Sequence, residues 1–553
     1  MNPADVLETA RGWLAQDPDP ATRAELEELV TKATDGEAAA SAELQTRFAG
    51  RLEFGTAGLR GELGAGSMRM NRVLVSQAAA GLAAYLLARE EQPSIVIGYD
   101  GRHNSDVFAR DTAELMAGAG VRAILMPRML PTPVLAFAVR HLDVSAGVMV
   151  TASHNPARDN GYKVYLGRDS EGSQIVAPAD KEIAAEIERV AAGSIADLPR
   201  STDFELADES VVTEYIAQTA AIGNAPAPLK FVYTAMHGVG WETASAVFRA
   251  AGFDDIVAVE EQLTPDPEFP TVAFPNPEEP GALDLSFEVA TEAGADLIIA
   301  NDPDADRLAV AIPSENGWRR LTGNEVGAWL GWRVAERMSQ GAEDGTLAAS
   351  IVSSPALSRI ARGYDLGYAD TLTGFKWVSR VPGLAYGYEE ALGYLVDPVK
   401  IRDKDGISAA VAFLSLASEL KAAGVSFEEH ERTFAEKFGA FASGQISVRV
   451  KDLKEIPAIT SRLRTEPPTE IGGVAVVQVD DFAVGVGEFP KGDILRYTLE
   501  GGSRVIVRPS GTEPKLKVYL DAASEEGSAE ERIAAAQRTL ETLDRGVRAL
   551  LAV

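Results

Sequence analysis

Along the first 440 residues, short runs of apolar, often β-branched residues alternate with longer stretches whose apolar residues recur at helical spacing. Residues 94–100 (SIVIGYD) and 295–302 (ADLIIAND) are typical of buried strands. Residues 108–120 (FARDTAELMAGAG) are typical of an amphipathic helix that ends at a glycine. This alternation predicts βα units and therefore mostly parallel sheets.

Three of the predicted strands run into a loop that is rich in small residues or contains glycine: 98–103 (GYDGRH), 234–240 (TAMHGVG) and 353–357 (SSPAL). This pattern predicts one βα module that is used three times. After residue 440 the pattern becomes apolar–polar alternation followed by a long helical tail, which predicts a final α+β domain. We therefore expect an α/β protein with three related modules of mixed, mostly parallel sheets and a C-terminal α+β domain. The expected segments are a helical extension at 1–45 and domains at 46–207, 208–320, 321–440 and 441–553.

The charge and the amino-acid composition of the chain exclude several classes of function. The 553 residues include 82 acidic and 52 basic side chains, a formal charge of −30, and no cysteine. A field of that sign repels polyanions, so we expect no nucleic-acid partner, and any phosphate site needs its own basic cluster. The absence of cysteine excludes disulfides and thiol chemistry. No apolar run approaches the length of a membrane span, and the N-terminus does not resemble a secretion signal, so we expect a cytoplasmic protein without membrane contact.

The segment 151–163 (TASHNPARDNGYK) follows an apolar strand and brings Ser153, His154 and Lys163 into one short stretch. No G-x-S-x-G elbow surrounds the serine, and the adjacent histidine is poorly placed to face its hydroxyl. An ordinary hydrolase triad is therefore not indicated. The segment is either a structural turn or carries a serine that is used in another way.

A second loop, 301–308 (NDPDADRL), follows the strand DLIIA and places Asp302, Asp304 and Asp306 at every second position. In an extended loop these carboxylates point to one side, where they repel one another unless a cation compensates them. Hard oxygen ligands of this kind suit Mg²⁺. A solvated acidic turn accounts for the same residues about equally well, and the neighbouring Arg307 favours the functional alternative because it could grip an anion.

A third segment, 504–520 (RVIVRPSGTEPKLKVYL), has the composition of a phosphate cradle on an acidic chain. It combines a guanidinium, hydroxyls, a glycine and further cations, although a hairpin turn also favours such residues. The side chains concerned are Arg508, Ser510, Gly511, Thr512, Lys515 and Lys517.

Three other segments carry weaker signals. Residues 54–66 (FGTAGLRGELGAG) place Arg60 among glycines, either near an anion or in a solvated connection. Residues 371–380 (TLTGFKWVSR) place Lys376 between aromatic residues. Residues 386–394 (YGYEEALGY) place Glu389 and Glu390 before a turn, where they could hold sugar hydroxyls or cap a helix.

Together these loops resemble one family, the α-D-phosphohexomutases. TASHNP resembles its phosphoserine loop, DPDADR its metal loop, YEEALG its sugar-binding loop and RPSGTEP its phosphate-binding loop, in the family's order. The match runs from about Phe54 to the C-terminus. FGTAGLRG, TGFKW and YEEALGY are most similar to the branch that holds phosphoglucomutase-2, phosphopentomutase and bacterial phosphoglucomutase/phosphomannomutase enzymes. The resemblance implies four domains around a central cleft.

The resemblance also implies roles for single residues. Ser153 would carry a phosphoryl group and complete a Mg²⁺ site with the three aspartates. Lys163 would be the general base, a role that requires a lowered pKa, which neighbouring arginines could provide. Arg60 and Arg307 would line the transfer site, while His154 would either touch the phosphoryl group or fix the loop. The residues implied to bind substrate are Lys376, Glu389, Glu390, Arg508, Ser510, Gly511, Thr512 and Lys517.

The implied activity is a phosphosugar mutase, an isomerase that interconverts glucose 1- and 6-phosphate or the mannose phosphates. Its serine would be phosphorylated, and a sugar 1,6-bisphosphate would serve as intermediate and activator. Many hexose-specific members have Ser where this chain has Ala391, so ribose or deoxyribose 1-phosphate remains an alternative substrate. A phosphomonoester hydrolase and a catalytically silent binding protein are further alternatives. We expect a small-molecule partner and either a monomer or a homodimer.

Overall fold

The computed structural model describes residues 3–450, 455–487, 489–509 and 515–551. It divides into two compact units. The first unit contains residues 1–320 together with 393–415, and the second contains residues 321–392 together with 416–553. Each unit is described by itself below.

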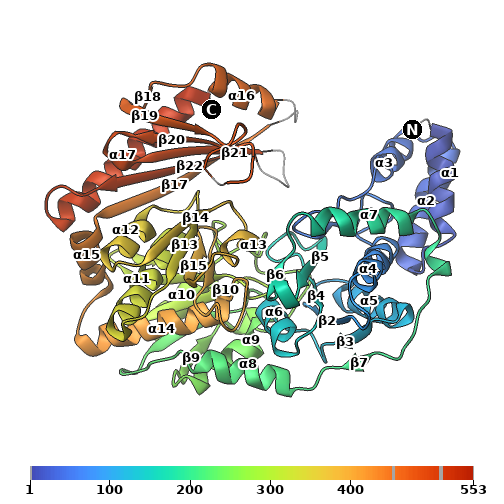
Figure 1. The fold of residues 1–553 in the computed structure, drawn as a ribbon, viewed down its shortest axis with the longest axis horizontal. Helices are drawn as coiled ribbons and strands as arrows, with labels where there is room; N and C mark the ends of the chain where they lie inside the picture. Colours follow the sequence, from blue (N-terminus) through green and yellow to red (C-terminus); the bar gives the residue numbers. More distant parts are fainter. Residues whose placement is uncertain (1–2, 451–454, 488, 510–514, 552–553) are drawn as a thin grey trace. The chain divides into compact units, whose positions relative to one another are not determined.

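The first unit begins with three helices, α1 (Pro3–Leu14), α2 (Pro20–Thr34) and α3 (Ala38–Arg47). Trp13, Leu26 and Phe48 form the centre of their shared apolar cluster, which also includes Val73 and Ile195 of the following domain. Because the cluster is continuous with that domain, the helical extension packs against it (Figure 1).

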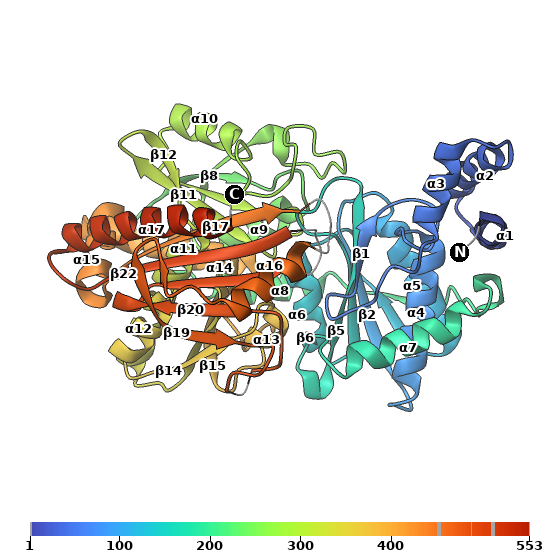
Figure 2. The same ribbon diagram turned by 90° about the horizontal axis from the view of Figure 1, so that it is seen from above.

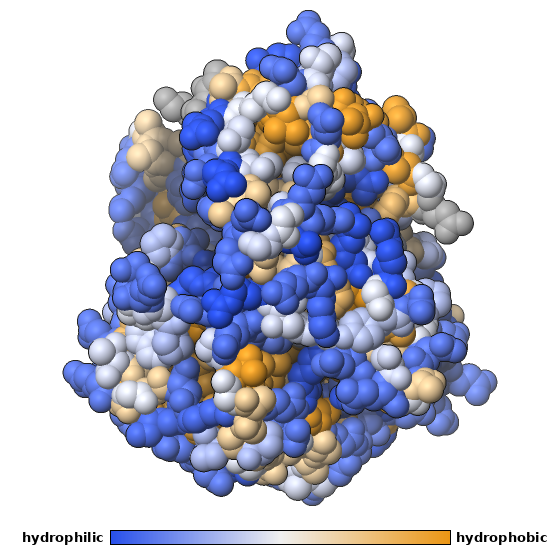
Figure 3. Space-filling view, turned by 90° about the vertical axis from the view of Figure 1, so that its left-hand side faces the viewer, coloured by the Kyte–Doolittle hydropathy of each residue, from blue (hydrophilic) through white to orange (hydrophobic). Residues whose placement is uncertain are grey.

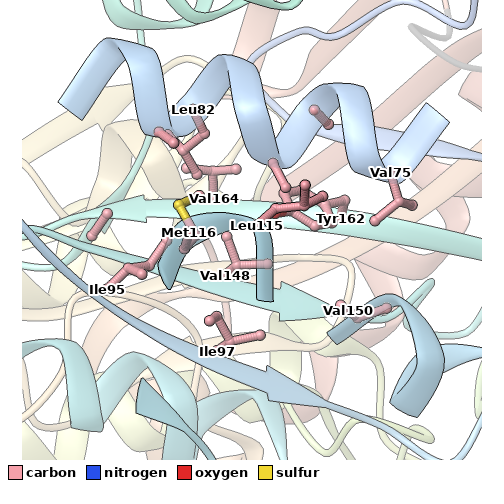
Figure 4. Packing of buried hydrophobic residues seen from close by; sticks show 14 of the residues in the cluster. Val75, Leu82, Ile95, Ile97, Leu115, Met116, Val148, Val150, Tyr162 and Val164 are labelled. Carbon is pink, nitrogen blue, oxygen red and sulfur yellow. The ribbon is translucent and has the colours of Figure 1, made fainter. Parts of the chain in front are cut away.

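The first sheet is seven-stranded, in the order β1-β5-β4-β2-β3-β7 with β6 beside β5. Its strands are β1 (Leu59–Glu62), β2 (Ser94–Tyr99), β3 (Arg122–Leu125), β4 (Ala146–Val150), β5 (Asp159–Leu166), β6 (Ser173–Gln174) and β7 (Glu205–Leu206). Its helices are α4 (Arg72–Leu87), α5 (Ser105–Ala119), α6 (Thr132–His141) and α7 (Ala179–Ala191), with short 3₁₀ turns η1 (Arg168–Ser170) and η2 (Ile195–Asp197). Helices α4 and α5 place apolar side chains on the buried strands (Figure 4), namely Val75, Leu82, Leu115 and Met116 on Ile95, Ile97, Val148, Val150, Tyr162 and Val164.

The second sheet is five-stranded, in the order β12-β11-β10-β8-β9. Its strands are β8 (Lys230–Thr234), β9 (Asp255–Ala258), β10 (Leu297–Asn301), β11 (Leu308–Ser314) and β12 (Gly317–Arg320). The helices around it are α8 (Ser210–Ala220), α9 (Gly240–Ala250) and α10 (Asp284–Ala293), with the turn η3 (Glu260–Gln262). The short strand β16 (Gly393–Leu395) also belongs to this first unit, where Gly393 forms an antiparallel bridge with Arg307.

The second unit contains a third parallel group, β13 (Thr346–Ser350), β14 (Gly367–Thr371) and β15 (Leu384–Glu389). Helices α11 (Gly323–Gly341), α12 (Ala356–Gly363), α13 (Phe375–Val378) and α15 (Phe427–Phe438) accompany it, and α14 (Gly406–Ala423) begins in the first unit and ends in the second.

An antiparallel sheet completes the second unit, in the order β17-β22-β21-β20-β19-β18. Its strands are β17 (Ala440–Arg449), β18 (Glu470–Ile471), β19 (Val474–Asp481), β20 (Leu495–Leu499), β21 (Arg504–Pro509) and β22 (Lys515–Ser524), with the turn η4 (Glu500–Gly502). Helices α16 (Glu455–Thr465) and α17 (Ala529–Leu551) share an apolar cluster with these strands and run along the sheet (Figure 2).

The three α/β modules share one strand order. In the first, β2 lies between β3 and β4 and is parallel to both. In the second, β8 lies in the same way between β9 and β10, and in the third β13 lies between β14 and β15. Antiparallel strands extend the first two sheets beyond β4 and β10, so these sheets are mixed. The prediction of one α/β module used three times, followed by an α+β domain, is confirmed.

Helix α14 is an exception to the expectation that no apolar run is long enough to span a membrane. Its 18 residues are long and apolar enough, by length and composition, to cross a membrane, although 72% of that stretch is buried inside the protein. A mostly buried apolar helix is typical of a protein core. The face shown in Figure 3 is mostly hydrophilic, with apolar residues in small patches, as the acidic composition suggests.

Candidate active site

The predicted catalytic loops occupy equivalent places in the three modules. Ser153 follows β4, Asp302 follows β10, and Glu389 ends β15, each of which is the third parallel strand of its module. The carboxyl ends of parallel strands lie at one sheet edge, where α/β proteins bind their ligands. The loops of the first two modules meet within the first unit.

Ser153 is buried, and its Oγ donates a hydrogen bond to Oδ2 of Asp302 over 2.8 Å. Its backbone N–H donates to Oγ1 of Thr151 at 2.9 Å. The φ angle of Ser153 is 53°, in the left-handed region, which costs a non-glycine residue about 1 kcal/mol. The fold therefore holds this hydroxyl against an acidic side chain in a strained conformation, as functional loops often do.

Arg102 supports the serine loop, and the sequence analysis did not single it out. Its guanidinium is buried and donates to four backbone carbonyls of the loop, those of Ser153, Asn155, Pro156 and Asp159, at 2.6–3.0 Å. Asp100 lies 3.5 Å from Arg102 Nε and balances its charge. Its place in GYDGRH, directly after a buried strand, is a signal that could have marked it.

Asp302, Asp304 and Asp306 form one buried cluster. One oxygen from each lies within 4.8 Å of the others, close enough to hold a single ion. Among the described residues, no hydrogen-bond donor reaches Oδ1 of Asp304 or Oδ1 of Asp306. Burial, together with the charges of Asp304 and Asp306, raises the pKa of Asp302. Three buried carboxylates, two of which have an oxygen without a hydrogen-bond donor in the described part of the chain, fit a hard divalent cation such as Mg²⁺.

Lys163 lies inside this cluster. Its Nζ is 2.8 Å from Oδ2 of Asp304 and 2.9 Å from Oδ2 of Asp306. Burial lowers the pKa of Lys163, but the charges of the two carboxylates outweigh burial and raise it above its ordinary value. The expectation that neighbouring arginines lower this pKa is wrong for this arrangement, because carboxylates and not guanidiniums contact the amine.

A second lysine reaches the same cluster from a distant segment. Lys404 Nζ lies 3.0 Å from Oδ2 of Asp306. The adjacent Asp403 accepts hydrogen bonds from the Tyr165 hydroxyl at 2.8 Å and from the Gln174 amide at 2.7 Å. The sequence analysis missed this segment, although KIRDKD at 400–405 places five charges before a buried apolar helix.

The remaining predicted residues of the transfer site surround the serine and the aspartates. Arg60 donates to Oδ1 of Asn155 at 3.2 Å, and Arg307 Nε lies 3.8 Å from Asp302 and 3.7 Å from Asp306. His154 Nδ1 is 3.5 Å from Ser153 Oγ and 3.6 Å from Oδ2 of Asp302. Burial, with the charges of Arg307 and Arg60, holds the pKa of His154 well below its ordinary value.

In the second unit, the two predicted sugar-binding carboxylates have different surroundings. Glu389 Oε1 accepts a hydrogen bond from the N–H of Gly374 at 2.6 Å, directly before α13, which carries Lys376. Glu390 Oε2 accepts from the hydroxyls of Ser350 at 3.1 Å and Ser353 at 3.0 Å. These contacts tie Glu390 to the end of β13 and make it a support of its loop.

The predicted phosphate-binding strand is partly described. Arg508 and Lys517 are direct partners across β21 and β22, and both side chains are half-buried. Like charges opposite each other in a sheet are unfavourable, so this pair suits a bound anion. Ser510, Gly511 and Thr512 lie outside the described residues, and Lys515 is the first residue of β22.

Another buried arginine was missed in this unit. Arg504 donates to Oδ2 of Asp521 at 2.7 Å and to the carbonyl of Ser353 at 2.5 Å. It therefore joins the strand that carries Arg508 to the loop that supports Glu390.

Comparison with known proteins now decides the family. Four models of the phosphoglucomutase/phosphomannomutase family match in chain order: α/β/α domain I at residues 51–193, domain II at 213–316, domain III at 322–436 and the C-terminal domain at 446–538. The chain belongs to the phosphoglucomutase/phosphomannomutase family. The resemblance to the α-D-phosphohexomutases and the predicted phosphomutase activity are confirmed.

Relatives differ in the substrate that their names state. The chain is 57% identical to a "Probable phosphomannomutase" of Haemophilus influenzae, over 88% of this chain and 98% of that protein. It is 36% identical to a "Probable phosphoribomutase" of Schizosaccharomyces pombe, over 92% of each chain, and 34% identical to a Staphylococcus aureus "Phosphoglucomutase", over 86% and 90%.

The fold has also been seen in solved structures. A putative phosphomannomutase from Thermus thermophilus covers 90% of this chain and 100% of its own, with a TM-score of 0.68 and 23% identity. At that identity the likeness shows the fold alone. It agrees with the predicted class of α/β modules and a C-terminal α+β domain.

Proposed function

We propose that this phosphomutase moves a phosphoryl group between C1 and C6 of a hexose, with the glucose and mannose phosphates as its substrates. The observation that carries the proposal is the 2.8 Å hydrogen bond from Ser153 Oγ to Asp302 within a buried cluster of three aspartates. A serine held on a cation-binding carboxylate suits a phosphoryl carrier and does not suit a serine hydrolase, which needs an activating base.

In the proposed reaction, the phosphoryl group on Ser153 Oγ moves to the free hydroxyl of a sugar monophosphate. The P–Oγ bond breaks, a new P–O bond forms on the sugar, and the hydroxyl proton leaves to a base. The resulting bisphosphate turns around, and its other phosphate returns to Ser153. Arg60 and Arg307 neutralise the charge that spreads over the transferring group, which is the main requirement of phosphoryl transfer.

Asp302, Asp304, Asp306 and an oxygen on Ser153 would hold Mg²⁺, which, when bound, supplies charge neutralisation at the phosphoryl group. Lys163 is protonated while it contacts Asp304 and Asp306. Lys163 would serve as the base for the hydroxyl proton in its neutral form, and the carboxylates that raise its pKa are the same ones that would hold Mg²⁺.

Residues of the second unit would hold the rest of the substrate. Glu389 would accept hydrogen bonds from sugar hydroxyls near Lys376, and Arg508 with Lys517 would bind the phosphate that is not reacting. The proposed binding loop continues into Ser510, Gly511 and Thr512, and a sugar 1,6-bisphosphate would restore phosphate on Ser153 when it is lost. The protein would act in the cytoplasm as a monomer or homodimer.

A pentose substrate is the second candidate. Ala391 stands where many hexose-specific members have Ser, and one relative of nearly equal length is named a phosphoribomutase. A smaller sugar would need fewer contacts beside Glu389.

The test is ³¹P NMR of the purified protein with Mg²⁺ and a trace of glucose 1,6-bisphosphate. Glucose 1-phosphate, mannose 1-phosphate and ribose 1-phosphate are supplied separately, and Ser153→Ala is the control. We expect a hexose 6-phosphate signal that requires Ser153. A faster ribose 5-phosphate signal would favour the pentose reaction, and growth of inorganic phosphate alone would contradict the mutase.

A further inference from the structure

A cavity of about 540 Å³ lies beside α13 in the second unit. Asp370 and Leu372 contribute from the end of β14, Trp377 and Arg380 from α13 and its following turn, and Phe489 from the connection between β19 and β20. The volume falls within the roughly 300–1,000 Å³ of small-molecule sites. Its lining does not include Lys376, Glu389 or Arg508, so the cavity is distinct from the predicted sugar and phosphate residues.

Arg380 gives the cavity its charge. Its Nη1 donates to the carbonyl of Lys376 at 2.8 Å, and no carboxylate of the described residues forms an ion pair with it. Burial lowers the pKa of Arg380, as expected for a desolvated cation without a counter-ion. On a chain with a formal charge of −30, a guanidinium left without a carboxylate marks a site for an external anion.

The acidic residue of the cavity does not cancel this attraction. Asp370 accepts a hydrogen bond from the Tyr368 hydroxyl at 2.6 Å, and Arg496 lies 3.7 Å from its second oxygen. Its charge is therefore balanced by neighbours other than Arg380.

The other walls are flat and apolar. Trp377 and Phe489 are half-buried, and the Phe489 ring packs edge-on against Phe482 with 5.3 Å between centroids. Aromatic side chains that are only partly covered favour the stacking of a flat ring. The cavity thus offers an apolar platform beside one positive charge.

We propose that this cavity binds a small organic anion that joins a flat ring to a phosphate, as a nucleoside monophosphate does. The phosphate contacts Arg380, and the ring packs on Trp377 and Phe489. Binding also changes the KM for the sugar phosphate, a step that rests on the proposed function. Trp377 and Arg380 follow Lys376 on α13 and its following turn, and Gly374, directly before α13, donates its N–H to Glu389.

Isothermal titration calorimetry with AMP tests the binding without any turnover. Adenosine supplies the ring without the charge, and inorganic phosphate supplies the charge without the ring. We expect AMP to bind better than both, and Arg380→Gln to weaken it by about 10-fold or more. Arg337→Gln, an exposed arginine of α11, is the matched control and should leave the affinity unchanged.

The variant Arg508→Gln tests whether AMP binds in this cavity or at the predicted phosphate-binding strand. Loss of AMP binding in that variant, with full binding in Arg380→Gln, would overturn the proposal, as would a lack of AMP binding to the wild-type protein. Hydrogen exchange of the wild-type protein gives a second measurement that needs no variant. AMP should protect residues 370–382, and unchanged exchange there would contradict the site.

The effect on activity is measured separately. AMP should change the KM of the wild-type enzyme for its sugar phosphate and not that of Trp377→Leu. An unchanged wild-type KM would overturn the coupling. If no sugar phosphate is converted at all, the proposed function fails while the calorimetric result still decides the AMP site.

Discussion

The first and third modules hold their candidate loops in opposite ways. In the first, the buried guanidinium of Arg102 binds four backbone carbonyls around Ser153 and leaves its side chain available. In the third, Ser350 and Ser353 bind the carboxylate of Glu390 itself. Arg102 thus contacts Ser153 through its backbone, whereas Glu390 is contacted through its side chain, as expected if the first reacts and the second supports its loop. The two kinds of contact therefore distinguish Ser153, the proposed reacting residue, from Glu390, the proposed supporting residue.

In the second module, the loop after β8 supports the loop after β10 through a different contact. The loop after β8 packs on the loop of Asp302, Asp304 and Asp306, because Val239 donates its N–H to the carbonyl of Pro303 at 2.8 Å. A Cβ on Gly238 would lie 2.2 Å from Pro303 backbone atoms. In all three modules, the loop after the first parallel strand supports the loop after the third, since both ends lie at one sheet edge.

The largest effect is expected for Arg102→Met. The change removes the donor to four carbonyls and leaves the buried Asp100 without its counter-ion, which should lower the free energy of unfolding by about 3–5 kcal/mol. The displaced serine loop should reduce kcat/KM by about 100-fold. Urea unfolding and steady-state kinetics measure the two effects. Arg110→Met, an exposed arginine of α5, is the control, and an equal loss there would show that the carbonyl contacts do not matter.

Gly238→Ala comes next. The new methyl group must displace the backbone of Pro303, between two of the aspartates, so we expect Mg²⁺ affinity to fall by about 10–100-fold. The Mg²⁺ dependence of the rate, or calorimetry with Mg²⁺ alone, provides the measurement. Gly12→Ala has open space around its Cβ and should change nothing; unaltered Mg²⁺ binding in Gly238→Ala would refute the supporting role.

Glu390→Gln and Glu389→Gln should differ from each other. The first weakens two hydrogen bonds to a carboxylate and should lower the free energy of unfolding by about 1–3 kcal/mol, with a smaller effect on KM. The second replaces one oxygen of the proposed sugar-binding carboxylate with an NH₂ donor and should raise KM by about 10-fold. The remaining oxygen can still accept from the N–H of Gly374, so we expect similar stability. Steady-state kinetics and urea unfolding of both variants measure these effects. A larger rise in KM for Glu390→Gln and a larger loss of stability for Glu389→Gln would exchange their proposed roles.

Ser353→Ala should have the smallest effect. The variant loses a hydroxyl that donates to Glu390 Oε2 at 3.0 Å, accepts from Glu390 N–H at 3.0 Å and lies 2.9 Å from Ser350 Oγ. We expect a cost of about 1 kcal/mol. Because both residues share one network, the double variant with Glu390→Gln should lose less than the sum, with a coupling of about 0.5–1 kcal/mol. Additive losses in urea unfolding would show that the two side chains act independently.

Much of the fold followed from local patterns. The alternation of strands and helices, the threefold module and the change of pattern near residue 440 all depend on neighbours along the chain, which periodicity records. The candidate residues Ser153 and Asp302 were found for the same reason, since each lies in a loop that follows a predicted strand, whereas the role of Glu389 came from the resemblance to the family. Arg102 and Lys404 were missed because their partners lie far away in sequence.

The amino-acid sequence by itself determined the chemistry that each loop carries and the order of these loops along the chain. Only the tertiary structure decided which of them meet. Lys163 contacts carboxylates 141 and 143 residues further on, and those contacts reversed the expected direction of its pKa. A pKa depends on burial and on distances between charges, and neither can be read from local periodicity because folding brings remote segments together.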